Sequence, residues 1–141
     1  MLLRLCLPAV LAASLASLGC GNGNGLYPVS GRVLFQGAPA VGATVTFVRK
    51  GAAASLNDQT PQGVVREDGS FTLAGPAGAG AAPGEYAVLV EWKVGAGKVR
   101  GRAPALSAPD RLKRRYLDAG RPLLTASVEA KSNALPPFEL K

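Results

Sequence analysis

Every second residue of the run 86–93 is large and apolar. Successive side chains of a β-strand point to opposite faces, so one face of this run carries four large apolar residues: Tyr86, Val88, Val90 and Trp92. The alternation predicts a strand with one buried face, and it constrains the fold because that face needs a second apolar layer to cover it. The opposite face, which carries Ala87, is expected to be wetter.

Other segments show the same period of two or a β-branched and aromatic composition typical of strands. The expected strands are residues 29–35, 44–48, 64–67, 70–73, 86–93, 123–130 and 138–140. Turn residues separate them at near-regular spacing and no long helix is indicated. About seven short strands in this pattern predict an all-β chain that forms a single β-sandwich.

Two hairpins are expected within this sandwich. Asp68-Gly69 is the residue pair that tight turns with positive φ prefer, so residues 64–67 and 70–73 are predicted to pair across it. Residues 29–35 and 44–48 are predicted to form a second hairpin, or to be neighbours across a short loop.

Residues 1–19 are expected to be a secretory signal peptide. Arg4 precedes the apolar run 5–18, and Gly19 follows it. One positive charge, a short apolar stretch and a small residue form the usual order of such signals. A permanent membrane-spanning helix needs about 20 apolar residues, which is more than this run supplies.

The junction Ser17-Leu18-Gly19-Cys20 resembles the lipobox of bacterial lipoproteins, in which the Cys thiol is acylated and the Cys becomes the new N-terminus. It departs from the usual lipobox, which has Leu three residues before the Cys and a small residue two before it. The alternative is an ordinary signal peptide that is cut nearby. We expect lipidation at Cys20.

The residues around this junction favour the lipoprotein. Residues 20–25, Cys-Gly-Asn-Gly-Asn-Gly, have the composition of a flexible tether. The chain has two Cys, and both Cys6 and Cys20 lie in the signal or at its end. The domain at residues 26–141 therefore has no thiol for a disulfide, although it is expected in an oxidising compartment.

Several segments together resemble a known family. They are residues 29–33 with 37–39 and 42–45, residues 68–73, and residues 83–88. These motifs are similar to those of carboxypeptidase regulatory-like domains, a transthyretin-like (prealbumin-like) β-sandwich. With the C-terminal segment, the whole chain is similar to small lipoproteins abundant in Planctomycetes. The resemblance implies a module for stability, spacing or adhesion, without catalytic or metal-binding residues.

The composition argues against an enzyme. The chain contains no His, and neither Cys belongs to the expected domain. Ser–His and Cys–His nucleophiles and the commonest zinc ligands are thereby removed, so we expect no catalytic residue, no metal and no cofactor. Tyr86, Trp92 and Tyr116 are candidates for a platform that stacks sugars, but the alternation around Trp92 favours a place in the core.

Positive charge is concentrated in one segment. The chain has 16 Lys and Arg against 9 Asp and Glu, and residues 93–121 hold nine of the basic residues against two acidic ones. Residues 95–115 are expected to be a mobile basic loop without core contacts. Residues 111–118 are expected to form one helical turn. The candidate anion-contacting residues are Lys98, Arg100, Arg102, Arg111, Lys113, Arg114 and Arg115.

These observations predict an exported, membrane-anchored lipoprotein of the cell envelope, either periplasmic or on the cell surface. Its expected partners are the membrane, through the lipid on Cys20, together with envelope proteins or anionic polysaccharide. Its β-sandwich would have a structural or interaction role. The alternative is a carbohydrate- or polyanion-binding module that uses residues 93–121. Nucleic acid is not expected, because the chain is exported and no aromatic residues interleave with the basic ones before Tyr116.

Overall fold

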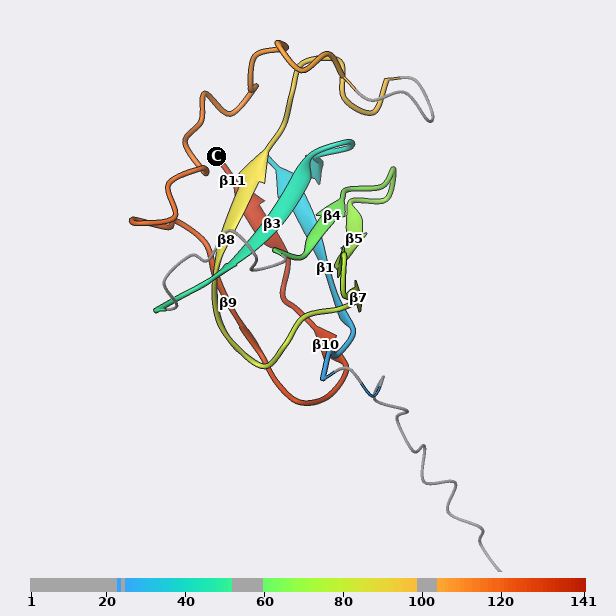
Figure 1. Cartoon of the computed structure of the whole chain (residues 1–141). Coiled ribbons are helices and arrows are strands. Elements are labelled where there is room, and N and C mark those ends of the chain that lie inside the picture. Colours follow the sequence, from blue (N-terminus) through green and yellow to red (C-terminus); the bar gives the residue numbers. More distant parts are fainter. Residues whose placement is uncertain (1–22, 24, 52–59, 99–103) are drawn as a thin grey trace, which may run out of the picture.

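The computed structural model describes residue 23 and residues 25–51, 60–98 and 104–141. Over these residues the chain is all-β, with eleven strands in two sheets and no α-helix. The two sheets pack face to face as a β-sandwich (Figure 1). The predicted fold class is confirmed. Seven strands have three or more residues, and the other four are two-residue strands that periodicity could not reveal.

β1 (Val29–Phe35) is paired with all four other strands of the five-stranded sheet. It runs antiparallel to two of them and parallel to two that come from the far end of the chain. The antiparallel partners are β2 (Ala38–Pro39) and β5 (Ser70–Thr72), and the parallel partners are β10 (Asn133–Ala134) and β11 (Phe138–Leu140).

The six-stranded sheet is built around β3 (Thr44–Arg49) and β8 (Gly84–Glu91), which pair over six residues. β8 also pairs with β9 (Thr125–Val128), which therefore forms one end of the sheet. On the other side of β3 the order continues through β4 (Gln62–Val64), β6 (Ala74–Gly75) and β7 (Gly78–Ala79).

The core lies between the two sheets. Phe47 of β3 contacts the ring of Phe71 from the opposite sheet, with ring centroids 6.4 Å apart. Phe71 in turn stacks on Phe138 at 6.2 Å. Val33 of β1 and Val88 of β8 are fully buried as well. Both inner faces thus supply apolar side chains to one layer, as a β-sandwich requires.

The alternation along residues 86–93 is confirmed, because Tyr86, Val88, Val90 and Trp92 are all buried. The prediction that the opposite face is wetter was wrong at Ala87, which is only 2% exposed. Ala87 lies in the middle of β8 between Val48 of β3 and Thr125 of β9. A short side chain with strands on both sides is covered by its neighbours even on the outer face of a sheet.

Residues 29–35 and 44–48 neither form a hairpin nor lie side by side in one sheet, so this expectation was wrong. The strands β1 and β3 belong to different sheets. β1 instead turns back at once into β2 through Gln36 and Gly37, whose φ angles are 51° and 83°. Two consecutive positive φ angles are characteristic of the tightest hairpin turns. The chain then crosses to the second sheet before β3 begins.

The turn at Asp68-Gly69 is present, but its two arms diverge. Gly69 has φ 84°, its N–H donates to the Arg66 carbonyl at 2.9 Å, and the Arg66 N–H donates to the Ser70 carbonyl at 2.8 Å. Beyond this point β4 pairs within the six-stranded sheet and β5 pairs with β1. The predicted hairpin is therefore a corner that passes the chain from one layer to the other.

Candidate functional site

Four of the seven predicted anion-contacting residues lie in one short segment. Arg111, Lys113, Arg114 and Arg115 are all exposed and follow one another within residues 110–116, which we call the basic turn. Lys98 is exposed and lies apart from them in the sequence. Arg100, Arg102 and the predicted lipidation site Cys20 lie outside the described residues.

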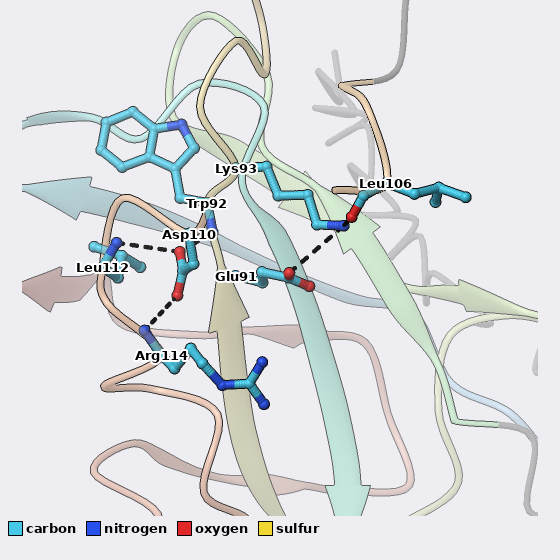
Figure 2. Close-up of polar contacts among 7 residues, drawn as sticks. All are labelled: Glu91, Trp92, Lys93, Leu106, Asp110, Leu112 and Arg114. Atoms are coloured by element: carbon cyan, nitrogen blue, oxygen red, sulfur yellow. Dashed lines mark hydrogen bonds and ion pairs between the residues drawn. The ribbon is translucent and has the colours of Figure 1, made fainter. Parts of the chain in front are cut away.

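The basic turn is organised by the carboxylate of Asp110. Its Oδ1 accepts hydrogen bonds from the backbone N–H groups of Trp92, at 2.9 Å, and Leu112, at 3.1 Å. Its Oδ2 accepts a third from the N–H of Arg114 at 2.8 Å. Figure 2 shows the carboxylate between the end of β8 and the turn, with the Leu112 and Arg114 nitrogens directed at its two oxygens. The carboxylate of Asp110 thus joins the turn to the end of the sheet.

Arg111 joins the turn to the core through Trp92. The guanidinium carbon lies 3.9 Å from the centre of the Trp92 ring, a cation–π distance. The indole N–H donates to the Val41 carbonyl at 2.9 Å, and the ring meets Phe35 edge-on at 5.6 Å. Trp92 is 7% exposed, so the interpretation as a core residue is confirmed and it offers no open platform for sugar stacking.

Two apolar residues of the turn are buried. Leu112 and Tyr116 each have only 6% of their surface exposed. The Tyr116 carbonyl accepts the N–H of Val90 at 3.1 Å, and its hydroxyl accepts the N–H of Lys141 at 3.0 Å. The turn therefore continues the hydrogen bonding of β8, with its apolar side chains inward and its basic ones outward.

Residues 111–118 do not form the predicted helical turn. Lys113 and Arg114 have φ angles of 54° and 60°, in the left-handed region, where a right-handed helix cannot continue. Non-glycine residues in this conformation cost on the order of 1 kcal/mol each and persist when their surroundings hold them. Here the Asp110 carbonyl accepts the Lys113 N–H at 3.1 Å, and Asp110 Oδ2 accepts the Arg114 N–H.

Residues 95–115 also differ from the expected loop without core contacts, because both of its ends are packed. Ala96 and Leu112 are buried. Gly97 approaches Val41 so closely that a Cβ added to it would lie 2.8 Å from the Val41 carbonyl oxygen. The apolar burial at these positions is not periodic, so the sequence pattern did not reveal it.

Lys93 has partners of its own and is not available to an anion. Its Nζ donates to the Leu106 carbonyl at 3.0 Å and lies 3.7 Å from a carboxylate oxygen of Glu91 (Figure 2). The four exposed cations of the basic turn differ from it. Within the described part of the chain, no Asp or Glu carboxylate oxygen comes within 4.0 Å of their side-chain nitrogens, whereas Lys131 pairs with Glu129 at 2.8 Å. Arg115 Nη1 donates to the main-chain oxygen of Lys141, the last residue, at 3.4 Å.

Sequence reasoning missed Asp110, which it counted only as an acidic residue among basic ones. The local signal is an Asp followed by a turn, a residue whose side chain commonly accepts N–H groups just downstream. Its third partner, the Trp92 N–H, is 18 positions away and leaves no trace in the local sequence.

No model of a known protein family matches the chain, and no curated protein matches it either. Among the described residues, no three His, Cys, Asp or Glu side chains are grouped so as to hold a metal ion. The same residues include no helix with the length and apolar character to cross a membrane. The chemistry that the basic turn offers is the binding of anions by exposed cations on a fixed backbone.

Proposed function

We propose that this chain is an exported lipoprotein, held at a membrane of the cell envelope by a lipid on Cys20, with a non-catalytic β-sandwich that has a structural or interaction role. The observation that carries the proposal is the order of segments. The leader-like residues 1–19 and the Gly/Asn run 20–25 come just before Tyr27, which forms a β-bridge with Ala81. A domain that begins immediately after a tether suits display from a membrane.

The proposed family is that of carboxypeptidase regulatory-like sandwiches. The two-sheet all-β architecture supports it, as do the positive φ angles of Gly37, Gly69 and Gly84, which lie in the motifs that carry the resemblance. Domains of this family act in stability, spacing or adhesion, which agrees with a role that needs no catalytic residue.

The test is to replace Cys20 and follow where the protein goes. Cys20→Ala should abolish incorporation of labelled palmitate and move the protein from the membrane fraction to the soluble fraction. Cys6→Ala is the matched control, because a Cys within a removed leader should leave both readouts unchanged. The proposal is wrong if the wild type takes up no palmitate, or if Cys20→Ala remains on the membrane.

A second candidate function, polyanion binding, is favoured by one specific observation. Four exposed basic side chains of residues 111–115 have no described Asp or Glu carboxylate within ion-pair distance. Such a cluster attracts anions, and the attraction is screened by salt over about 8 Å at physiological ionic strength. This function is compatible with the first, since a lipid-anchored module can also bind a polymer.

A further inference from the structure

The basic turn and the start of β1 lie at opposite ends of the sandwich. At the start of β1, Val29 pairs with Asn133, and Tyr27 just before it pairs with Ala81. At the end of β1, the Phe35 ring contacts the Trp92 ring, and the Arg111 guanidinium lies over that Trp92 ring. The six residue steps of the strand span about 20 Å. In Figure 1 the first described residues lie at the bottom, and the orange segment that contains the basic turn lies near the top.

The backbone that carries the cations of the turn is held in one conformation before any ligand arrives. Lys113 and Arg114 have the left-handed conformation, and the oxygens of Asp110 hold the backbone N–H of each. The Cα atoms of residues 111–115 can span no more than about 15 Å, so four positive charges are confined to a small region. A ligand of matching charge therefore loses little to ordering of the protein backbone.

The same geometry favours a soluble anion over a lipid surface. The apolar side chains of the turn, Leu112 and Tyr116, are buried and cannot insert into a bilayer. The turn also lies at the end of the domain away from residue 25, where the proposed tether joins. An anchored domain would have to lie on its side to bring this turn to its own membrane.

We propose that the basic turn is a preformed binding site for an extended anionic polysaccharide, sulfated or carboxylated, presented on the side of the domain that faces away from the anchoring membrane. The orientation rests on the proposed function through the lipid on Cys20. The binding itself rests only on residues 110–116.

The first experiment measures the affinity of residues 26–141, which contain both sheets and the whole described core, for dextran sulfate. Lys113→Gly/Arg114→Gly removes two cations and places the residue type that best tolerates a positive φ at both positions. We expect the Kd to rise at least about fivefold, the scale of one or two lost charge-assisted contacts. Lys50→Gln/Lys131→Gln removes the same charge from exposed positions outside the turn and should change the Kd by less than about twofold.

A second pair of variants separates a preformed site from net charge alone. Asp110→Ala removes a negative charge but also the acceptor that holds the turn, so we expect weaker binding. Asp118→Ala removes an exposed carboxylate that accepts the Gly120 and Arg121 N–H groups, and it should leave binding unchanged or slightly tighter. Tighter binding by Asp110→Ala, or equal losses in the glycine and glutamine pairs, would overturn the proposed site.

Vesicles test the competing ligand and the orientation. Sedimentation with phosphatidylglycerol vesicles should depend less on the glycine pair than dextran sulfate binding does. Binding to these vesicles without binding to dextran sulfate would overturn the proposal in favour of a lipid surface. The lipidated full chain in phosphatidylcholine vesicles should bind dextran sulfate as the free domain does, and loss of binding there would refute the orientation. If Cys20 carries no lipid, the result for the free domain still stands.

Discussion

Arg111 contacts Trp92 twice, through its guanidinium 3.9 Å from the ring centre and through its N–H, which donates to the Trp92 carbonyl at 2.7 Å. The Arg111 side chain is exposed, yet it covers one face of the ring of Trp92, a residue that is itself buried. A residue that sequence reasoning placed in a mobile charged loop is thus part of the wall of the core, and replacing it affects stability as well as charge.

Arg111→Ala should therefore destabilise the domain by about 0.5–2 kcal/mol, the range of a cation–π contact that is partly desolvated. Arg115→Ala is the matched control, since its guanidinium lies 5.9 Å from the Tyr116 ring and it should cost less than about 0.5 kcal/mol. Urea unfolding of both variants measures the difference. Equal free energies of unfolding for the two variants would mean that Arg111 contributes charge only.

The two faces of β8 should be almost equally intolerant of charge near its centre. Val88→Asp and Ala87→Asp each place a carboxylate at a buried position, which costs several kcal/mol and is enough to unfold a small domain. Thr125→Asp, at the exposed cross-strand neighbour of Ala87, should remain folded. Thermal unfolding followed by circular dichroism checks all three, and a stable Ala87→Asp domain would contradict the burial of that side chain.

Asn133 should be the polar residue whose loss costs the sandwich most. It is buried, its Oδ1 accepts the N–H of Glu129 at 2.9 Å, and its Nδ2 donates to the carbonyls of Glu129 and Lys131 at 3.1 and 2.7 Å. Asn133→Ala should lower the free energy of unfolding by about 1–3 kcal/mol, because it leaves these backbone groups without their partner. Ser132→Ala, at the exposed preceding position, should have little effect.

The turn at Asp68 should make stability depend on pH in the acid range. Hydrogen bonds from Ser70 lower the pKa of the Asp68 carboxyl below its ordinary value of 3.8, the one from the hydroxyl more than the one from the N–H. The positive charge of Arg32 lowers this pKa further. The charged form therefore stabilises the fold above the ordinary pKa, and this contribution disappears as the pH falls through the lower folded pKa.

The melting temperature of wild type should accordingly exceed that of Asp68→Asn near neutral pH, and the gap should close as the pH falls below 3.8. Glu67→Gln removes a charge from the adjacent residue, which lacks the bonds to Ser70, and serves as the control. An equal difference in melting temperature between wild type and Asp68→Asn at neutral and acid pH would show that the Asp68 carboxyl does not cause the pH dependence.

Local rules predicted the features that depend on local chemistry. The period of two predicted the buried face of β8, and the preference of glycine for positive φ predicted the turns at Gly37 and Gly69. These rules could not say which strands would pair. The two arms of the turn at Gly69 enter different sheets because β1 pairs with β5 more than 30 positions away in the sequence, and no local pattern encodes that choice.

The candidate site was predictable in its charges and unpredictable in its shape. The cluster of Arg and Lys residues is visible in the sequence, whereas the carboxylate of Asp110 accepts the N–H of Trp92, 18 positions away at the end of β8. The positive φ angles of Lys113 and Arg114 could not be predicted either, since neither Lys nor Arg is a residue type that favours the left-handed conformation.

The parallel pairing of β1 sets an order of events for folding. Its partners β10 and β11 come from the far end of the chain, and the hydrogen bond between Asn133 and Pro28 joins residues 105 positions apart. Contacts at such separations form slowly, because a long loop must close before they contribute. While the chain is synthesised, β1 lacks these partners until the last strands emerge. The five-stranded sheet cannot be completed before these C-terminal strands are present, so its late formation is built into the order of the strands.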